Sequence, residues 1–220
     1  MHPCIADYVS ENFYKGLLST PAAVEQARLG ADECGLYWVS YETGRFGAET
    51  APTDARGNKI TSKVNLEEAK LALAVVRALP SLRKSILVIT FYKAQEAALR
   101  ETFEKAGVAE FAGDGAAGTK GTLRICSVDQ AQGSEADVVV LSCVRSNAKA
   151  DVGFLKKPNR ANPRKDEANP DRPNVAVSRA RERLVVVGDV RTLRAGGGKH
   201  WASLLDHCAE AKPNSMPALV

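Results

Sequence analysis

Residues 123–142 have the sequence LRICSVDQAQGSEADVVVLS, in which two mostly apolar runs flank a polar turn. The runs Leu123 to Val128 and Val138 to Ser142 are each of strand length. Strands without regular polar alternation are buried on both faces, which is typical of a parallel sheet covered by helices. This stretch therefore predicts an α/β fold with a mostly parallel central sheet and helices on both faces.

Similar patterns extend outward from this stretch in both directions. Further apolar strands are expected at 36–39, 86–89 and 184–187. Apolar residues at helical spacing, with start and stop signals, predict helices at 3–9, 65–79, 93–106, 173–180 and 199–210. Asn65 followed by Glu68 is typical of a capping box. Loops are expected at 41–63 and 147–172, and we interpret the glycine run 196–198 as a flexible loop.

The composition excludes several classes of protein. Of the 220 residues, 45% are hydrophobic and 25% are charged, which is ordinary globular usage and excludes collagen-like, mucin-like and wholly disordered chains. The apolar runs are strand-sized, so no membrane span and no membrane partner are expected. The start, Met1 to Cys4, resembles no secretory signal. The five cysteines show no C-x-x-C spacing, which indicates no metal site and favours an intracellular, cytoplasmic or nuclear location.

The positive charge is unevenly distributed along the chain. The formal net charge is +4, and residues 156–199 hold twelve Lys or Arg against five Asp or Glu. A basic stretch on a nearly neutral body indicates contact with phosphates or nucleic acid. A solvated basic loop that keeps the protein soluble explains the same charge equally well.

One phosphate-binding motif is matched by the residue pattern but not by the expected secondary structure around it. Residues 113–118 fit G-x-G-x-x-G, but the dinucleotide fingerprint must follow a strand and open a helix, whereas here the glycines lead into a strand. We interpret them as a surface loop. The sequence contains no G-x-x-x-x-G-K-[ST], so these residues provide no Walker A loop.

Three segments next to the expected strands carry the side chains best suited to chemistry. In 88–95, Tyr92 offers a ring for stacking and Gln95 a donor and acceptor edge, although aromatic residues after strands are often only packed. In 127–135, Gln132, Gly133 and Glu135 form a turn that allows close approach of a ribose or phosphate, or an ordinary polar turn. We expect these groups at the ends of strands, where open α/β sheets bind ligands.

The third segment, 174–183, is expected to be a short helix with Ser178, Arg179 and Arg181 facing outward or into a cleft. A fixed guanidinium stabilises the charge on a transferring phosphoryl group, and arginine suits this better than lysine because of its planar fork. The alternative is a basic helix face that makes salt bridges.

Taken together and in this order, the three segments resemble motifs IV, V and VI of superfamily 1 helicases, most closely the up-frameshift-like branch, superfamily 1B. Met1-His2-Pro3 and residues 13–18 resemble the R-M-H-P and F-Y-x-G-x-L segments of that family. Residues 141–147 and Gly153-Phe154-Leu155 fit its pattern too. The resemblance spans roughly residues 1–208.

The resemblance implies a second RecA-like domain with a P-loop NTPase fold that lacks its own Walker A loop. ATP would lie between this domain and a first RecA-like domain, supplied in cis or in trans, which would hold the Mg²⁺. Arg179 looks like the arginine finger. The nucleotide contacts would be Tyr92, Gln95, Gln132, Gly133, Glu135 and Arg181. The contacts to single-stranded RNA or DNA would be Ser127, Val128, Asp129 and Arg145.

The resemblance also suggests a division of the chain and a function. An N-terminal helical entry segment is expected at 1–33, the second RecA-like domain at 34–210 with a basic insert at 156–173, and a tail at 211–220. The insert either lengthens the nucleic-acid path or is a solvated loop. We expect an ATP-dependent helicase domain that hydrolyses no ATP by itself. The alternatives are a non-catalytic single-strand-binding module and an α/β domain whose motifs are idle.

Overall fold

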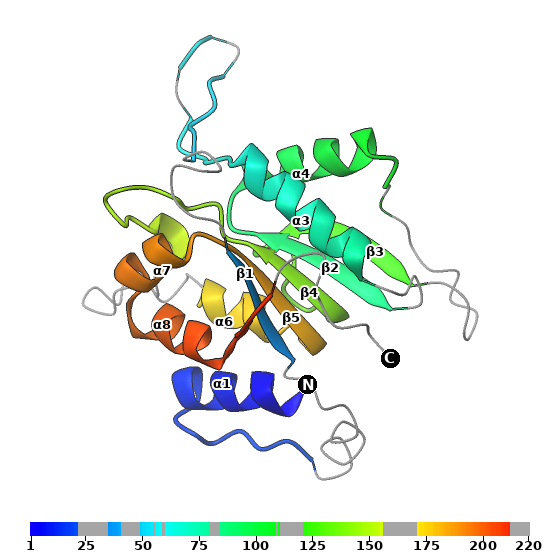
Figure 1. The fold of residues 1–220 in the computed structure, drawn as a ribbon, viewed down its shortest axis with the longest axis vertical. Coiled ribbons are helices and arrows are strands. Elements are labelled where there is room, and N and C mark those ends of the chain that lie inside the picture. Colours follow the sequence, from blue (N-terminus) through cyan, green and yellow to red (C-terminus); the bar gives the residue numbers. More distant parts are fainter. Residues whose placement is uncertain are drawn as a thin grey trace.

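A computed structural model of the chain contains a six-stranded, all-parallel sheet with helices on both faces (Figure 1). It describes residues 1–21, 35–40, 49–54, 56–58, 60–79, 84–108, 110, 121–155 and 171–211. The strand order is β3-β2-β4-β5-β1-β6. The predicted α/β class, with a mostly parallel sheet between helical layers, is therefore confirmed.

Five of the six strands form where the apolar runs predicted them, and the short sixth strand was not predicted. The strands are β1 (Leu36–Ser40), β2 (Ser85–Thr90), β3 (Thr122–Ser127), β4 (Ala136–Ser142), β5 (Ala180–Gly188) and the short β6 (Ala209–Glu210). β4 lies in the middle of the sheet, with Val139 beside Leu87 of β2 and Leu184 of β5. Its side chains are buried on both faces, which explains why its sequence shows no polar alternation.

Two helices cover one face of the sheet. They are α3 (Leu66–Ala78) and α4 (Lys93–Lys105), which pack on each other and on β2, β3 and β4. Val76, Leu99 and Phe103 meet Val88 and Val140 in one apolar cluster. The capping box at the start of α3 is confirmed in part, because the Asn65 side chain accepts a hydrogen bond from the backbone N–H of Glu68.

The remaining helices belong to the opposite face. They are α1 (Pro3–Phe13), the 3₁₀ turn η1 (Gly153–Leu155), α6 (Arg172–Val177), α7 (Val190–Gly196) and α8 (Gly198–His207). Ile5 of α1 and Trp201 and Leu204 of α8 join Leu141 and Leu184 in the second apolar cluster. α1 therefore shares a core with the sheet (Figure 1).

Three local expectations are wrong. The helix predicted at 199–210 ends at His207, and Ala209–Glu210 form β6, which pairs with β1. The helix predicted at 173–180 ends at Val177, and Ala180 already belongs to β5, so Arg181 lies on a strand. The glycine run 196–198 is a tight junction between α7 and α8. A Cβ on Gly196 would lie 1.6 Å from the carbonyl oxygen of Ala150, so close packing requires glycine there.

Several expectations fall outside the described residues. These are the glycine motif at 113–118 and most of the segments 22–33, 156–173 and 211–220. Across the part of the chain that is described, no helix is both long enough and apolar enough to cross a membrane.

Candidate functional site

The predicted site residues are divided between two opposite edges of the sheet. At the carboxyl edge, after the ends of β2, β3 and β4, lie Tyr92, Gln95, Ser127, Val128, Asp129 and Arg145. At the amino edge, before β4 or at the start of β5, lie Gln132, Gly133, Glu135, Arg179 and Arg181. We expected all three segments at the carboxyl ends of strands, and this is wrong for two of them. Residues 128–135 lead from the end of β3 back to the start of β4, and Arg179 directly precedes the start of β5.

Arg179 stands in the turn between α6 and β5, and its guanidinium is held by its own chain. Its Nε donates to the carbonyl oxygen of Val175 at 3.0 Å, and its Nη1 to that of Ser134 at 3.2 Å. Its Nη2 donates to the Ser178 hydroxyl at 2.9 Å. These three hydrogen bonds fix the orientation of the half-buried guanidinium. Its positive charge is therefore held in one position, from which it can act on a bound anion.

The turn before β4 joins Arg179 at the amino edge. The backbone N–H of Ala136 donates to the carbonyl oxygen of Arg179, so the two motif segments are hydrogen-bonded. Gly133 has a φ of +79°, and no atom stands within 4 Å of the place where a Cβ would be. Arg181 Nε pairs with Glu135 Oε2 at 3.1 Å, and because both side chains are exposed, this pair is easily exchanged for a ligand.

At the amino edge, Asp137 of β4 is hydrogen-bonded to the first residue of β2. Its Oδ2 accepts hydrogen bonds from the backbone N–H and the hydroxyl of Ser85, at 2.8 and 2.7 Å. Burial acts to raise the pKa of Asp137, but these bonds, with Arg181 and Lys84 nearby, lower its pKa overall. The carboxylate is thus a fixed anion beside the start of β5, where Arg181 Nη1 lies 3.7 Å from its Oδ1.

We expect Asp137→Asn to lower the free energy of unfolding at neutral pH by about 1–2 kcal/mol, because the Ser85 bonds lose a charged acceptor. A lowered folded-state pKa contributes stability above the unfolded pKa of about 3.9 and loses it as the pH falls through the folded value. Urea unfolding from pH 7 to pH 2.5 should therefore show a smaller acid loss in the variant. An equal loss would contradict this role, and Asp206→Asn, in an exposed pair with Arg194, is the control.

At the carboxyl edge, Tyr92 and Arg145 are bonded to each other and buried. Arg145 Nη1 donates to the Tyr92 hydroxyl at 3.2 Å, and burial raises the pKa of Tyr92. Arg145 Nη2 lies 2.9 Å from Glu49 Oε1 and 2.8 Å from Asp151 Oδ2. A buried guanidinium between two carboxylates holds the loop after β4 in place, and its role as a nucleic-acid contact stays a prediction.

Gln95 is fully buried, and both the oxygen and the nitrogen of its side-chain amide are hydrogen-bonded. Its Oε1 accepts from the backbone N–H of Asn65 at 2.8 Å, and its Nε2 donates to the carbonyl oxygen of Asn65 and to the Ser142 hydroxyl, both at 3.1 Å. In this arrangement Gln95 links the start of α3 to the end of β4. Direct contact with a nucleotide stays a prediction that this burial disfavours.

The third part of the carboxyl edge combines an exposed aromatic ring with polar groups. Ser127 and Val128 are buried at the end of β3, whereas Asp129 is exposed and pairs with Arg172 at 3.0 Å. The Arg172 guanidinium lies 5.6 Å from the ring centre of Phe154, which is 53% exposed. Tyr92 approaches Phe154 from the sheet side, with ring centres 5.5 Å apart.

Sequence reasoning assigned no function to Arg172 or Phe154. The signal for Phe154 was its place in the Gly153-Phe154-Leu155 pattern, but its exposure depends on η1, which lies within a predicted loop. The pairing of Arg172 with Asp129 joins residues far apart in the sequence, so no local pattern could indicate it.

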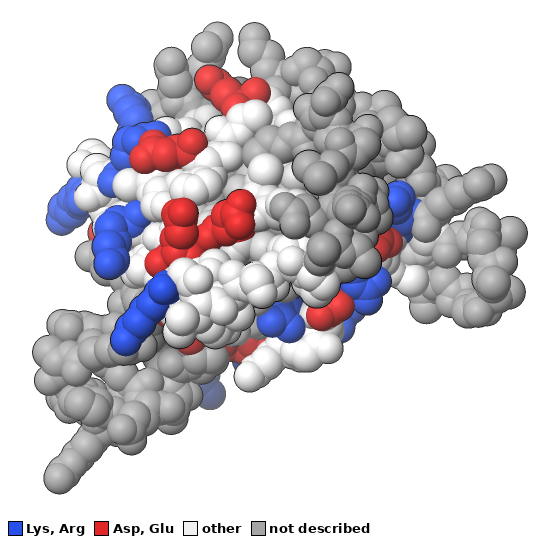
Figure 2. Space-filling model, turned by 90° about the horizontal axis from the view of Figure 1, so that it is seen from below, with Lys and Arg blue, Asp and Glu red and all other residues white. Residues whose placement is uncertain are grey.

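The positive charge is not concentrated in one place on the face drawn in Figure 2, where Lys and Arg side chains are interspersed with Asp and Glu. Residues 156–170 of the basic stretch lie outside the described residues. Within the residues that are described, no group of three or more His, Cys, Asp or Glu side chains is placed to hold a metal ion.

The parallel sheet between helical layers, with the motif residues at its edges, defines a RecA-like helicase domain. The family described as "AAA domain" matches residues 1–164. The chain belongs to this family, as an up-frameshift-like superfamily 1 helicase domain.

Curated relatives match the chain over nearly its whole length. It is 28% identical to the probable helicase senataxin of Homo sapiens over 211 residues, which is 93% of this chain and 7% of that protein. It is 31% identical to the regulator of nonsense transcripts 1 homolog of Neurospora crassa over 218 residues, 96% of this chain and 18% of that protein. The ATP-dependent helicase upf1 of Schizosaccharomyces pombe is 27% identical over 222 residues, 96% of this chain and 21% of that protein. The chain thus spans less than a quarter of these relatives' length.

Proposed function

We propose that the chain is the second motor domain of an ATP-dependent RNA or DNA helicase, which closes over ATP held by a first RecA-like domain and grips a single strand. The observation that carries the proposal is the setting of Arg179 at the amino edge, oriented by Val175, Ser134 and Ser178. A guanidinium so fixed needs little reorganisation when negative charge develops beside it.

The amino edge is the side that would meet the first domain. ATP with Mg²⁺, both held there by that domain, would supply the phosphoryl group that is transferred to water. Arg179 would direct positive charge at this group, and the open backbone at Gly133 would allow close approach. Glu135 and Arg181 would exchange their exposed pair for contacts with the nucleotide.

The carboxyl edge would hold the single strand. In the turn at Ser127 to Asp129, only Asp129 is exposed, and a phosphate can replace it as the partner of the Arg172 guanidinium. The exposed face of Phe154 offers a surface on which a base can stack. Phosphate contacts and base stacking do not depend on the nucleotide sequence, which a domain that steps along a nucleic-acid strand requires.

We expect Phe154→Ala to weaken binding of a labelled oligouridine at least about fivefold, because one stacked base contributes about 1–3 kcal/mol. Fluorescence anisotropy at fixed salt measures the change. Leu66→Ala is the matched control, since Leu66 is 56% exposed but starts α3 on the other face of the sheet. If both variants bind like the parent, the stacking role of Phe154 is wrong.

The proposal itself is tested by adding the first domain. By itself the chain should hydrolyse ATP no faster than a buffer control. Fusion to the P-loop domain of an up-frameshift-like relative should restore ATP hydrolysis that is stimulated by single strands. Fusions that bind ATP and single strands but never hydrolyse ATP would contradict the proposal.

A non-catalytic single-strand-binding module is the second candidate. It is favoured by one observation, that all three nitrogens of the Arg179 guanidinium already have acceptors within this chain. This candidate predicts salt-sensitive binding of single strands that no first domain changes. For either function we propose an intracellular location, in cytoplasm or nucleus, and the division of the chain at residues 33 and 210 stays a prediction.

A further inference from the structure

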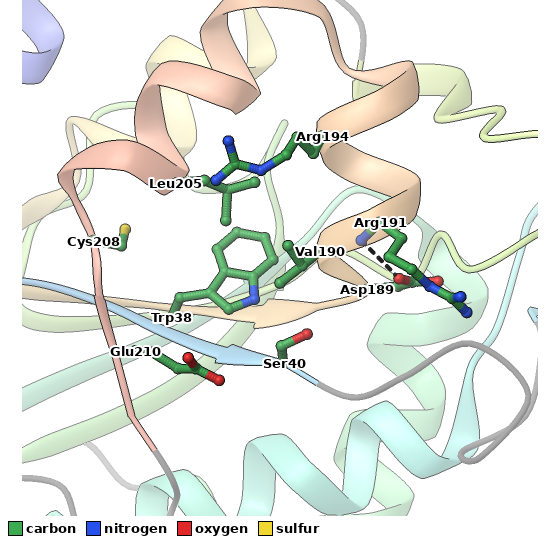
Figure 3. Close-up of a pocket in the computed structure, with 9 residues that line it drawn as sticks. All are labelled: Trp38, Ser40, Asp189, Val190, Arg191, Arg194, Leu205, Cys208 and Glu210. Atoms are coloured by element: carbon green, nitrogen blue, oxygen red, sulfur yellow. Dashed lines mark hydrogen bonds between the residues drawn. The ribbon is translucent and has the colours of Figure 1, made fainter.

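A pocket of about 450 Å³ lies between the α7–α8 pair and the sheet, away from the helicase motifs (Figure 3). Its floor is formed by β1 and β6 and its wall by α7 and α8. The residues that line it are Trp38, Ser40, Asp189, Val190, Arg191, Arg194, Leu205, Cys208 and Glu210. This volume is in the range that holds a small organic ligand.

The floor carries a buried donor without an acceptor. Trp38 is only 3% exposed, and its indole Nε1 has no hydrogen-bond partner. The indole N–H of Trp201 instead donates to the carbonyl oxygen of Leu155 at 2.8 Å. Leaving a buried donor unpaired costs about 1–3 kcal/mol. In Figure 3 the Trp38 nitrogen lies on the side of the ring that faces Ser40 and Val190. The nitrogen itself is buried, so a ligand oxygen would reach it only with a small shift of these neighbours.

The wall of the pocket favours negative charge on the ligand. Arg194 of α7 extends over the pocket beside Leu205 (Figure 3), and it pairs with Asp206 only in an exposed ion pair, which a ligand can replace at little cost. The guanidinium of Arg191 points away from Trp38. The Asp189 carboxylate already accepts hydrogen bonds from the backbone N–H groups of Arg191 and Thr192 and from the hydroxyls of Thr192 and Ser146. Glu210 stands on the opposite rim and would direct an anionic group toward α7.

The rest of the pocket is apolar, and the topology favours a site here. The Trp38 ring, Val190 and Leu205 offer apolar surface. Among the described residues, the first helix after β1 is α3, whereas the helix after the neighbouring β5 is α7, and these two helices pack on opposite faces of the sheet. Adjacent parallel strands whose connections diverge in this way open a crevice at their carboxyl ends, where α/β sheets bind ligands.

We propose that this pocket binds a small organic anion whose oxygen atoms accept from Trp38 Nε1 and Arg194 and whose apolar body rests on Val190 and Leu205. The site lies at the carboxyl ends of β1 and β5, at the opposite edge from the proposed nucleotide contacts and apart from the ends of β2, β3 and β4 where the single strand is proposed. Binding would pair the one buried indole donor that the structure leaves unsatisfied among the described residues.

Nuclear magnetic resonance of the ¹⁵N-labelled full chain tests this directly, because the sequence contains two tryptophans and hence two indole N–H signals. Trp38→Phe identifies the Trp38 signal. Naphthalene-1-acetate should shift this signal with a dissociation constant of about 1 mM or below and leave the Trp201 signal in place. Naphthalene-1-acetamide, the neutral analogue, should bind at least about fivefold more weakly, and acetate should cause no shift.

Two variants distinguish binding in this pocket from binding to any basic part of the surface. Arg194→Gln should weaken binding of naphthalene-1-acetate about fivefold, whereas Arg77→Gln on α3 should not change it. The proposal is overturned if the Trp38 signal does not move, if both indole signals move alike, or if acid and amide bind equally. The comparison of ligands uses the unaltered chain, so it stands even where a variant fails to fold.

Discussion

An Arg179→Ala variant, fused to a first RecA-like domain, should hydrolyse ATP about 10³-fold or more slowly than the same fusion with Arg179. An arginine finger contributes about 10³–10⁵ to the rate because it neutralises charge on the transferred phosphoryl group. The expected loss is in kcat, measured at saturating ATP and single strand. Affinity for the single strand should stay within about twofold, because Arg179 lies at the opposite edge of the sheet from Ser127 to Asp129.

Two further variants control this result. Arg179→Lys keeps the charge but loses the planar fork that bonds Val175, Ser134 and Ser178, so it should recover only a small part of the rate. Arg77→Ala removes an arginine from the helix layer and should leave the rate unchanged. Thermal unfolding must show that the Arg179 variants remain folded. A folded Arg179→Ala fusion with a rate within threefold of the parent would show that Arg179 is not the finger.

Features of the fold that depend on local sequence were predictable. The strands β2, β3, β4 and β5 form at their apolar runs because burial on both faces requires side chains of that kind. The Asn65 cap formed because its bond to the Glu68 N–H needs only residues three apart. The helix α7 was not predicted, because its seven residues carry too few apolar positions to show a period.

Features that depend on how the chain crosses the sheet were not predictable. Residues 128–135 return to the amino edge without a helix, so Glu135 lies there, and Arg179 lies there because it directly precedes β5. Both are therefore away from Tyr92, although all three were expected at the carboxyl ends of strands. The glycine run is rigid because Gly196 packs on Ala150, a contact between distant parts of the sequence. The unpaired Trp38 indole likewise depends on packing of β1 under α7 and α8, which no motif encodes.

The loop after β4 shows how buried groups hold the carboxyl edge in place. Val144 has a φ of +71°, which is strained for a β-branched residue. Its backbone N–H donates to Glu68 Oε1 at 2.6 Å, and its carbonyl oxygen accepts from Asn65 Nδ2 at 3.3 Å. Ser142 Oγ donates to the same Glu68 oxygen at 2.5 Å. Glu68 is fully buried, so these bonds rather than water stabilise its side chain.

We therefore expect Glu68→Ala to lower the free energy of unfolding by about 3–5 kcal/mol, because it leaves the Val144 N–H and the Ser142 hydroxyl buried without this acceptor. Urea unfolding measures the loss. Glu67→Ala is the matched control, since Glu67 is the neighbouring residue on α3 and makes only an exposed pair with Lys70, so it should cost about 0.5 kcal/mol or less. Glu68→Gln keeps an acceptor oxygen and should fall between the two. Equal losses for the Glu68 and Glu67 alanine variants would show that the strained Val144 is held by the remaining contacts of its loop, such as the Asn65 amide, and not by Glu68.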